Sequence, residues 1–408
     1  MSDGQRPQVI VVGAGPAGLS CALALRALDV PVTVLESESA RTAKPGSRAI
    51  YVHGTTLRSL DTVRPGLGWD IARRGIVWPT KRTFWRGREV FAQTYPAPPH
   101  DSLPPFTSLP QRRIEEALVA QCAAAGVEIV WDRAVSSVTA GVDGVDVRDT
   151  RGGVWTVQYV VGADGARSTV RREIGITMRG RRSRNSYVIV DVEADPGDAR
   201  PLERVFHYEH PAVDGRNVLL VPFAGGWRVD LQCRVHDDPQ TFSGERAADW
   251  VVAVMGERYR ARVDWVSTYQ FLQVVASSLT DASRRVLLIG EAGHLFAPFG
   301  ARGLNSGVAD AVAAARAIRA ALAASDAGAA AVSVDEFARS RLDAAQRNRR
   351  AAALALAATE SGHVWHVARR RIAGMLAPRV RRAAAWLDAA PYGPRLSGGS
   401  RGAAIGGY

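Results

Sequence analysis

Residues 9–18 read Val-Ile-Val-Val-Gly-Ala-Gly-Pro-Ala-Gly, and Glu36 follows the next apolar run of the chain. The pattern predicts a buried strand over residues 9–12, a glycine turn, a helix from about Pro16 to Asp29, and a second strand that ends at the carboxylate. The start of such a helix presents free N–H groups and the positive end of its dipole to phosphates. The sequence therefore predicts a dinucleotide-binding βαβ unit.

The glycines of this stretch each have a distinct physical role. Gly13 permits the tight turn, Gly15 leaves room for a pyrophosphate to approach the backbone, and Gly18 lets the helix pack closely on the strand. Glu36 comes 18 residues after Gly18, close to the spacing at which a carboxylate binds the adenosine ribose. The alternative is a glycine-rich turn that binds nothing, and the combination of strand, helix and acid argues against it.

Composition limits the classes of protein that need to be considered. The chain has 408 residues, is 47% hydrophobic and carries a formal net charge of +12, so it is long enough for a large core and more than one lobe. Among its 52 basic residues only Lys44 and Lys81 are lysines, which points to the codon bias of a GC-rich genome. We therefore expect no nucleic-acid partner, although a positive field would help to attract an anionic substrate or NADPH.

Cysteines and apolar runs indicate a reducing, soluble environment. Cys21, Cys122 and Cys233 are far apart and form no ligand pattern, so neither a disulfide framework nor a zinc site is expected. The apolar start is interrupted by glycine and proline, and the Ala-rich stretch 308–332 contains Asp and Arg, so no signal peptide or membrane span is expected. We expect a cytoplasmic protein that does not bind membranes.

The texture of the sequence changes twice along the chain. A short hairpin with its turn at Arg86-Gly87 and a strand over residues 154–162 are expected in the first part of the chain. Strand-like runs, the last of them over residues 263–275, dominate residues 185–279 and predict an antiparallel sheet, with one helix over residues 245–258 between them. Residues 285–290 return to a short apolar strand of the first kind. Helical patterns follow over residues 303–324, 334–358 and 362–376. The predicted division is listed here: a discontinuous dinucleotide-binding domain over residues 1–80, 106–184 and 280–330, a substrate domain over residues 81–105 and 185–279, C-terminal helices over residues 331–390, and a flexible tail over residues 391–408.

Two further motifs end apolar strands with an acid and a glycine. Residues 160–168 read Val-Val-Gly-Ala-Asp-Gly-Ala-Arg-Ser, where Asp164 ends the strand and Ser168 can cap the next helix. Residues 288–307 place Glu291 after a strand and then a glycine-rich loop before a long helix. A carboxylate in that position can accept hydrogen bonds from sugar hydroxyls, and the helix start can direct N–H groups at a ring that becomes negative.

Together the three motifs resemble the single-component FAD-dependent aromatic hydroxylases, the para-hydroxybenzoate hydroxylase-like family, over about residues 8–350. The resemblance implies an α/β fold with a discontinuous Rossmann-like FAD-binding domain, an inserted antiparallel β-sheet substrate domain and C-terminal helices. It also implies FAD as cofactor and NADPH or NADH as a transient reductant. The residues that match the family's FAD-binding positions are Gly13, Gly15, Ala17, Gly18, Glu36, Arg48, Gln111, Asp164, Gly165, Glu291, Gly303, Leu304 and Asn305.

The chain departs from the family pattern at three positions. Glu291 stands where the third motif usually has Asp, Gly293 where Ala is usual, and Ala301 where a second glycine is common. The longer acid keeps the chemistry of the ribityl contact, so FAD remains the expected cofactor. Longer polyketide-type relatives carry a thioredoxin-like C-terminal domain, and we expect this protein to lack it.

The resemblance implies a monooxygenase that uses NAD(P)H and O2 to hydroxylate a phenolic or polyketide-like aromatic molecule through a flavin C4a-hydroperoxide. FAD motifs alone leave open a same-fold oxidoreductase that performs epoxidation, Baeyer–Villiger oxidation or isoprenoid reduction, and a binding module without turnover. A homodimer is possible. The chemistry resides on the cofactor, so a catalytic side chain need not be obvious.

Side chains that act on the substrate are difficult to identify from the sequence. His53, Tyr208 and Tyr269 are weak catalytic candidates, since a histidine or tyrosine in such a position is more often structural. His294 belongs to the third motif and is expected to support its loop. The aromatic residues of the sheet that are candidate pocket walls, though each is more often sheet core, are Tyr187, Phe206, Tyr208, Phe223, Trp227 and Tyr269.

Overall fold

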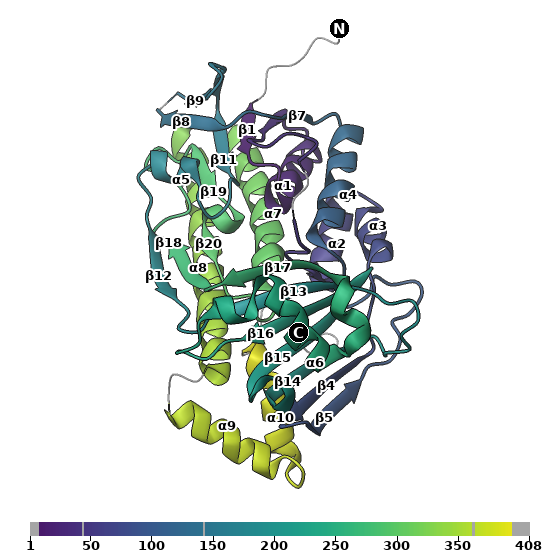
Figure 1. Cartoon of the computed structure of the whole chain (residues 1–408). Helices are drawn as coiled ribbons and strands as arrows, with labels where there is room; N and C mark the ends of the chain where they lie inside the picture. The colour runs from purple at the N-terminus through teal and green to yellow at the C-terminus, as the bar shows by residue number, and fades with distance from the viewer. Residues whose placement is uncertain (1–7, 43–44, 142, 361–363, 394–408) are drawn as a thin grey trace.

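The computed structural model describes residues 8–42, 45–141, 143–360 and 364–393, and it shows two lobes joined by long helices (Figure 1). The upper lobe in that view is built on a parallel sheet of five strands in the order β19-β11-β1-β2-β7. Its strands are β1 (Val9–Val12), β2 (Val32–Leu35), β7 (Glu128–Val130), β11 (Tyr159–Gly162) and β19 (Val286–Leu288). All neighbouring pairs in it are parallel, which confirms the expected dinucleotide-binding architecture.

Helices α1 (Pro16–Arg26), α4 (Gln111–Ala124) and α7 (Arg302–Leu322) contribute to the core of this lobe. The sequence predicted that the first helix would continue to Asp29, but it ends at Arg26 because the chain turns there and Asp29 takes a φ of 58°. Strands β1, β2, β11 and β19 are fully buried, as expected for a parallel sheet covered on both faces, whereas the edge strand β7 is partly exposed.

The apolar run 154–162 was expected to be one strand and is instead two. Val154–Val157 forms β10, which pairs antiparallel with β9 (Val145–Asp149) and, through it, with β8 (Val135–Ala140). Gln158 and Tyr159 both donate their backbone N–H to the Gln8 carbonyl, and from there the chain enters the parallel sheet as β11. Periodicity could not show this change of sheet, because both halves of the run are apolar.

The lower lobe is a sheet of seven strands in the order β17-β13-β16-β15-β14-β4-β5 (Figure 1). Its strands are β4 (Thr80–Trp85), β5 (Arg88–Thr94), β13 (Tyr187–Glu193), β14 (Glu203–His210), β15 (Arg216–Phe223), β16 (Gly226–Gln232) and β17 (Val263–Tyr269). The sheet is antiparallel as predicted except for β14 and β4, which pair in parallel. That pair joins the early hairpin, whose turn is Arg86-Gly87 as predicted, to the later strands.

The two faces of this sheet differ because its strands alternate. Val190, Trp227 and Val229 point to one face and pack against α6 (Ala247–Met255). The predicted helix over residues 245–258 is shortened, since its α-helical part stops at Gly256, which has a φ of 103°.

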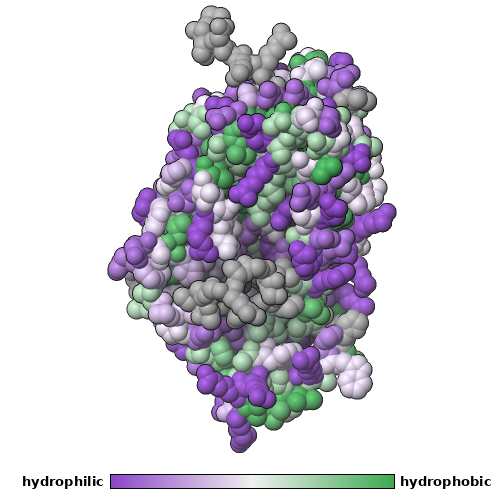
Figure 2. All heavy atoms as spheres, turned by 180° about the vertical axis from the view of Figure 1, so that it is seen from behind, coloured by the Kyte–Doolittle hydropathy of each residue, from purple (hydrophilic) through white to green (hydrophobic). Residues whose placement is uncertain are grey.

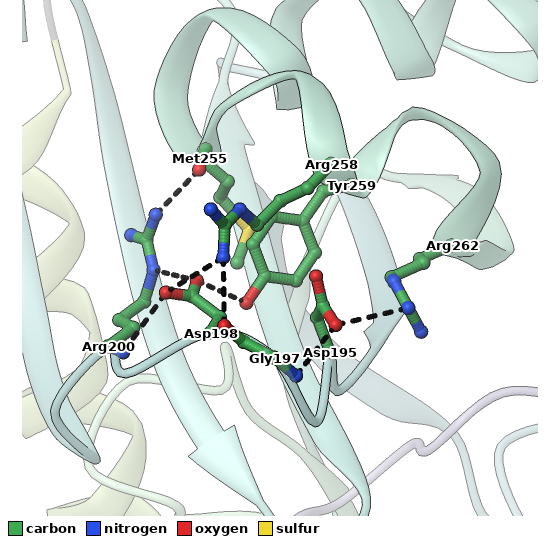
Figure 3. A network of polar contacts seen from close by, with 8 residues as sticks. All are labelled: Asp195, Gly197, Asp198, Arg200, Met255, Arg258, Tyr259 and Arg262. Carbon is green, nitrogen blue, oxygen red and sulfur yellow. Dashed lines mark hydrogen bonds and ion pairs between the residues drawn. The ribbon is translucent and has the colours of Figure 1, made fainter.

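Beside α6, a network of acidic and basic side chains fastens the chain around Asp198 to the segment that follows the helix (Figure 3). Asp198 accepts a hydrogen bond of 2.8 Å from the Tyr259 hydroxyl and lies 3.4 Å from Arg200 Nε. These contacts lower the pKa of Asp198, the Tyr259 hydroxyl contributing most. Every oxygen of this carboxylate has a partner, so the network serves the fold of the lobe.

The other face of the seven-stranded sheet is turned toward α8 (Ala327–Thr359) and the loop before α7. Val334 and Phe337 of α8 pack in the core of the upper lobe, whereas Ala352 and Leu356 pack beside Tyr187 of β13. This helix therefore bridges the two lobes. It begins at Ala327, earlier than predicted, because the Asp326 side chain accepts the backbone N–H of Ala329 at 2.9 Å.

Three more C-terminal elements close the lower lobe: α9 (Val364–Leu376), α10 (Arg381–Ala389) and a short 3-10 helix (Ala390–Tyr392). Lys81 Nζ of β4 lies 2.5 Å from Asp388 Oδ2, which fixes α10 to the sheet. The flexible tail was expected from residue 391, but the Tyr392 carbonyl accepts a hydrogen bond of 3.0 Å from Arg302, so the ordered chain extends at least to that residue. Residues 394–408 lie outside the described residues.

The remaining elements are short or connect the lobes. They are β3 (Tyr51–His53), α2 (Gly54–Val63), α3 (Leu67–Arg74), β6 (Phe106–Ser108), α5 (Thr169–Glu173), β12 (Met178–Arg182), β18 (Leu272–Ala276) and β20 (His294–Leu295). The predicted strand 263–275 is thus divided, its second half pairing with β12.

Viewed from behind, hydrophilic side chains cover much of the surface, and apolar ones emerge among them in several places, the lower end included (Figure 2). The lower end carries α9, where Trp365 is 86% exposed and Met375 57% exposed. In the described part of the chain, no helix combines the length and the apolar character that crossing a bilayer requires.

Candidate functional site

The three sequence motifs meet at one edge of the parallel sheet. Gly13 follows β1, Ala163 follows β11 and Gly290 follows β19, and these strands are neighbours in the sheet. A Cβ placed on Gly13 would lie 2.5 Å from the Ala163 carbonyl oxygen, so the first and second motifs are in contact. A Cβ on Gly290 would lie 3.0 Å from the Ala17 Cβ, which brings the third motif against α1.

At the start of the first helix, Gly18 is tightly packed and Gly15 faces open space. A Cβ on Gly18 would lie 1.9 Å from the Gly13 carbonyl oxygen, so only glycine permits this approach of helix and turn. A Cβ on Gly15 would meet no atom within 4 Å, and this open space lies at the N-terminus of α1. An anionic group fits there, because the first turn of the helix offers N–H groups and a positive dipole end.

Glu36 is buried at the end of β2 and holds the neighbouring turns. Its Oε2 accepts the Ala14 N–H at 2.6 Å, and its Oε1 accepts the Glu38 N–H and the Ser37 hydroxyl, each at 3.0 Å. A carboxylate offers about four lone-pair sites, so one remains for a sugar hydroxyl. The position and chemistry of Glu36 fit the predicted ribose contact.

One carboxylate oxygen of Asp164 accepts hydrogen bonds within the fold, and the other has no partner in the described part of the chain. Its Oδ2 accepts the N–H groups of Thr169 at 2.7 Å and Val170 at 3.1 Å, while Ser168 caps the same helix as predicted by accepting the Arg171 N–H. The second oxygen, Oδ1, is buried and has no hydrogen-bond partner among the described residues. Gly165 follows in a left-handed turn with a φ of 78°. An orphaned buried oxygen beside the shared edge suits a ligand donor.

The loop of Ser47, Arg48 and Ala49 is attached to the seven-stranded sheet. The Ser47 N–H donates to Asp191 Oδ2 at 2.5 Å, its hydroxyl donates to Asp191 Oδ1 at 2.7 Å, and Arg228 donates to that hydroxyl. Gln111 at the start of α4 holds the other end of the loop, since its Oε1 accepts the Ala49 N–H at 3.4 Å. Sequence analysis identified Gln111 and Arg48 but missed Asp191 and Arg228.

Arg48 and Glu291 are both exposed, and their opposite charges interact. Arg48 has a φ of 53°, a left-handed conformation that costs a non-glycine residue energy. Packing around Glu291 raises the pKa of its carboxyl, and the guanidinium of Arg48 opposes that rise. The structure therefore brings together a residue from the second loop of the chain and one from the third motif.

The start of α7 is shaped by two features. Ala301 precedes the helix with a φ of 50°, a left-handed conformation that favours glycine. A Cβ on Gly303 would meet nothing within 4 Å, so the first turn of α7 faces open space, and Leu304 packs at the edge of the core behind it.

Asn305 fastens this helix start to the strand β3 and the helix α2. Its Oδ1 accepts the His53 N–H at 2.9 Å and the Thr56 hydroxyl at 2.7 Å, and its Nδ2 donates to the Tyr51 carbonyl at 3.0 Å. The side chain is thus fully engaged in holding the helix start in place.

His294 supports the third motif and takes no part in an open site. Its Nε2 lies 2.6 Å from Asp310 Oδ2, which also accepts the Gly290 N–H at 3.2 Å, and Arg341 donates to Oδ1 at 2.7 Å. Burial alone would raise the pKa of Asp310, but His294 and Arg341 lower it. His294 Nδ1 is buried without a hydrogen-bond partner among the described residues, while the contacts of Nε2 agree with the expectation that His294 supports its loop.

A cavity lies between the inner face of the seven-stranded sheet and the loop before α7. Its lining includes Tyr187, Phe206, Asp230, Gln232, Phe271 and Phe299. Its volume is about 20 Å³, room for about one water molecule, so the aromatic walls must move before a ring can enter. Among the predicted pocket walls, Tyr187 and Phe206 line the cavity, whereas Trp227 packs on the opposite face beside α6.

The three weak catalytic candidates lie in different surroundings. His53 is near the site, with its Nε2 3.2 Å from the Gly300 carbonyl, and burial lowers its pKa to about 4. The Tyr208 hydroxyl donates to the Leu387 carbonyl at 2.8 Å in the cluster with the C-terminal helices, away from the cavity lining. Tyr269 is 41% exposed on the edge strand β17 and does not line the cavity either. The described residues contain no group of acidic, histidine or cysteine side chains suited to a metal ion.

Comparison with known proteins agrees with this geometry. A family model described as FAD binding domain matches residues 6–357. The chain is 31% identical over 314 residues to 6-methylpretetramide 4-monooxygenase of Streptomyces rimosus, covering 75% of this chain and 54% of that protein. It is 29% identical over 323 residues to para-nitrophenol 4-monooxygenase of Pseudomonas sp. strain WBC-3, covering 74% and 75%. It spans between 54% and 62% of the length of the first curated relatives it matches.

Solved structures show the same fold. The crystal structure of p-nitrophenol 4-monooxygenase from Pseudomonas putida DLL-E4 superposes with a TM-score of 0.74 at 25% identity, covering 96% of this chain and 99% of that one. A flavin-dependent monooxygenase in complex with FAD and substrate gives a TM-score of 0.73 at 24% identity, covering 95% of this chain and 72% of that one. The Rossmann-like FAD-binding fold with an inserted sheet, expected from the motifs, is thereby confirmed.

Proposed function

Since the chain belongs to the FAD binding domain family, we propose that it is an FAD-dependent monooxygenase that uses NAD(P)H and O2 to hydroxylate an aromatic small molecule. The observation that carries the proposal is the convergence of three acid-and-glycine loops at the edge shared by β1, β11 and β19. The relatives named above act on a pretetramide and on para-nitrophenol, which supports an aromatic substrate.

The site fits the cofactor at both ends. We assign the open space at Gly15 to the diphosphate, Glu36 to the adenosine ribose, and the orphaned Oδ1 of Asp164 to a donor of the bound dinucleotide. Gly165, Gln111 and Ala17 shape the turns that surround these groups. When bound, FAD supplies the redox chemistry, taking a hydride from NAD(P)H and activating O2.

Residues of the chain supply orientation and charge. The open first turn of α7, at Gly303 to Asn305, directs N–H groups toward a ring that gains negative charge on reduction. Arg48 adds a positive charge near Glu291, and we assign Glu291 to the ribityl hydroxyls. The aromatic walls of the cavity exclude water from the place where the substrate reacts.

The proposal is tested by purification and turnover. The protein should be yellow, release FAD on denaturation, and consume NADPH or NADH faster when a suitable phenol is added, with an oxygen atom from O2 in the product. A colourless protein that does not take up FAD contradicts the proposal. Epoxide, ester or reduced isoprenoid products would instead identify the alternative oxidoreductase with the same fold.

The predicted division into domains, the cytoplasmic location and the possible homodimer complete the proposal. Sedimentation at several protein concentrations measures the oligomeric state directly.

A further inference from the structure

Asp230 is a carboxylate on the inner face of the seven-stranded sheet whose burial is not compensated. It lies on β16, directly opposite Ile189 of β13 and Leu219 of β15, so its flanking neighbours in the sheet are apolar. Its Oδ1 is buried and has no hydrogen-bond partner among the described residues. Native proteins rarely leave a buried carboxylate oxygen in this state without a functional reason.

The charged groups around Asp230 are occupied elsewhere. Arg228 lies 3.5 Å from Asp191 and donates a hydrogen bond to Ser47, so its contacts are with the loop and not with Asp230. The Tyr187 hydroxyl accepts a hydrogen bond of 3.0 Å from Gln232. Glu360, at the end of α8, adds negative charge near Tyr187. No described basic side chain forms an ion pair with Asp230.

Desolvation therefore governs the ionisation of this carboxyl. It raises the pKa of Asp230 from 3.8 to about 7, with Arg228 opposing the rise and Asp191 adding to it. A proton acceptor works best when its pKa lies near the working pH, because it is then both ionised and basic. The environment of Asp230 meets this condition, whereas the carboxylate of Asp198 has its pKa lowered by its partners.

The cavity places Asp230 where an aromatic substrate would lie. Phe206, Phe271 and Phe299 form apolar walls around it. Phe299 belongs to the loop that leads into the open first turn of α7, the proposed flavin contact. A phenol ring held by these walls would find a hydrogen-bond acceptor in Asp230, because Asp230 Oδ1 has no hydrogen-bond partner within the described part of the protein.

A larger polar pocket adjoins the cavity on the outside. It has a volume of about 650 Å³, and Arg216, Arg234 and Arg371 are among its lining residues. Asn217 and Gln232 line both the pocket and the cavity, and Asn217 Nδ2 donates to Gln232 Oε1 at 2.8 Å. Two amide side chains thus line both Asp230's cavity and a neighbouring pocket whose volume would hold a small aromatic molecule.

We propose that Asp230 is a catalytic residue that accepts the hydroxyl proton of a phenolic substrate bound in this cavity. The substrate O–H bond breaks as a carboxyl O–H bond forms, and the negative charge passes from the carboxylate to the phenolate, so the net charge of the pair does not change. The phenolate is the more electron-rich ring that an oxygen-transfer reaction requires. This inference rests on the proposed function, which supplies the reaction that the phenolate enters.

The first test compares Asp230→Asn with Asp198→Asn, a matched change of an acid in the same lobe that sits in the network of Figure 3. With a phenol that the wild type hydroxylates, Asp230→Asn should lower kcat/KM by about 100-fold or more and abolish the rise of kcat with pH near 7. FAD content should stay unchanged, and Asp198→Asn should keep the wild-type pH profile. An Asp230→Asn enzyme within about threefold of wild type, with the wild-type pH profile, overturns the inference.

The second test needs no turnover and uses phenol and its methyl ether, anisole, as probes of the FAD-loaded wild type. Phenol has a pKa of about 10 and stays protonated below about pH 9. Its affinity should rise with pH through the ionisation of Asp230, because an ionised carboxylate accepts a stronger hydrogen bond, while the affinity of anisole should fall.

In Asp230→Asn both affinities should be independent of pH over this range. Identical pH dependence of the two probes in the wild type overturns the inference. A wild type that makes no product from any phenol but shows the opposite pH trends contradicts the proposed reaction and supports Asp230 as the proton acceptor, so the two failures are distinguishable.

Discussion

The edge of the parallel sheet and the inner face of the seven-stranded sheet meet at the same site but are made functional in different ways. At the edge, the backbone and its glycines shape the site. At Gly13, Gly15 and Gly18 a single added methyl group would collide with neighbouring atoms or fill the open space. On the inner face, side chains at alternate positions do it, as at Asp191 and Asp230. A backbone site tolerates few sequences, whereas a side-chain site depends on which residues the sheet places opposite one another.

The strongest way to break the edge is Gly18→Ala. Its Cβ would lie 1.9 Å from a backbone carbonyl that cannot move without opening the turn at Gly13, so the cost should exceed about 3 kcal/mol of unfolding free energy. The melting temperature should fall strongly, and the purified protein should contain no bound FAD. The control is Gly197→Ala in an exposed turn, where the nearest side-chain atom would lie 3.5 Å away, and it should leave both measurements unchanged.

The corresponding change on the inner face is Asp191→Ala. Arg228, 10% exposed, would lose its carboxylate and the Ser47 loop would lose two hydrogen bonds, so we expect a cost of about 3 kcal/mol and weaker FAD binding. Asp198→Ala is the comparison, because its partners Arg200 and Arg258 are 29% and 52% exposed. That variant should lose only about 1 kcal/mol in denaturant unfolding. Equal losses would show that the loop contact carries no special weight.

These two variants illustrate what could be predicted from the sequence. The strand, turn and acid of residues 9–36 have a fixed spacing, since the backbone itself makes the turn, and the fold followed from that, while the residues that contact FAD stay a prediction. Asp191, Arg228 and Asp230 have no spacing motif, because their function depends on the register of β13, β15 and β16. The alternation of polar residues at 228, 230 and 232 was the one available signal, and it had no meaning until the face was known to be covered.

The ionisation of Asp230 gives a prediction for stability. Its folded pKa of about 7 lies above the usual 3.8, so the folded state holds the proton more tightly between those values. Wild-type stability should therefore fall, relative to Asp230→Asn, as the pH rises from about 4 to about 7, and the difference should level off above that at about 2–4 kcal/mol. Denaturant unfolding across this range measures it.

Asp198 predicts the opposite sign in the same experiment. Its folded pKa is lowered, so its contribution to stability is present above the unfolded pKa and is lost as the pH falls. The difference between wild type and Asp198→Asn should accordingly shrink toward acid pH. If both variants changed with pH in the same direction, the distinction between a partnered and an unpartnered carboxylate would be refuted.

Gly15→Ala separates folding from cofactor binding at the edge. No atom lies within 4 Å of its Cβ, so the apoprotein should unfold as the wild type does. The added methyl group would stand where the diphosphate approaches, and FAD affinity should fall by about tenfold or more, a change of about 1.4 kcal/mol. Fluorescence titration of the apoprotein with FAD measures this. Unchanged affinity would place the diphosphate elsewhere.

We expect the smallest change in stability at Ala301, because an alanine there adopts a left-handed backbone conformation that favours glycine. Its φ of 50° costs an alanine about 1 kcal/mol, so Ala301→Gly should raise the unfolding free energy by roughly 0.5 kcal/mol after the greater entropy of the unfolded glycine is subtracted. Ala309→Gly on the exposed side of the same helix should lower it by about 1 kcal/mol. Opposite signs in thermal unfolding would confirm that the helix start stores strain where the flavin ring is proposed to lie. A destabilised Ala301→Gly would mean that the alanine side chain makes a contact worth more than the strain it costs.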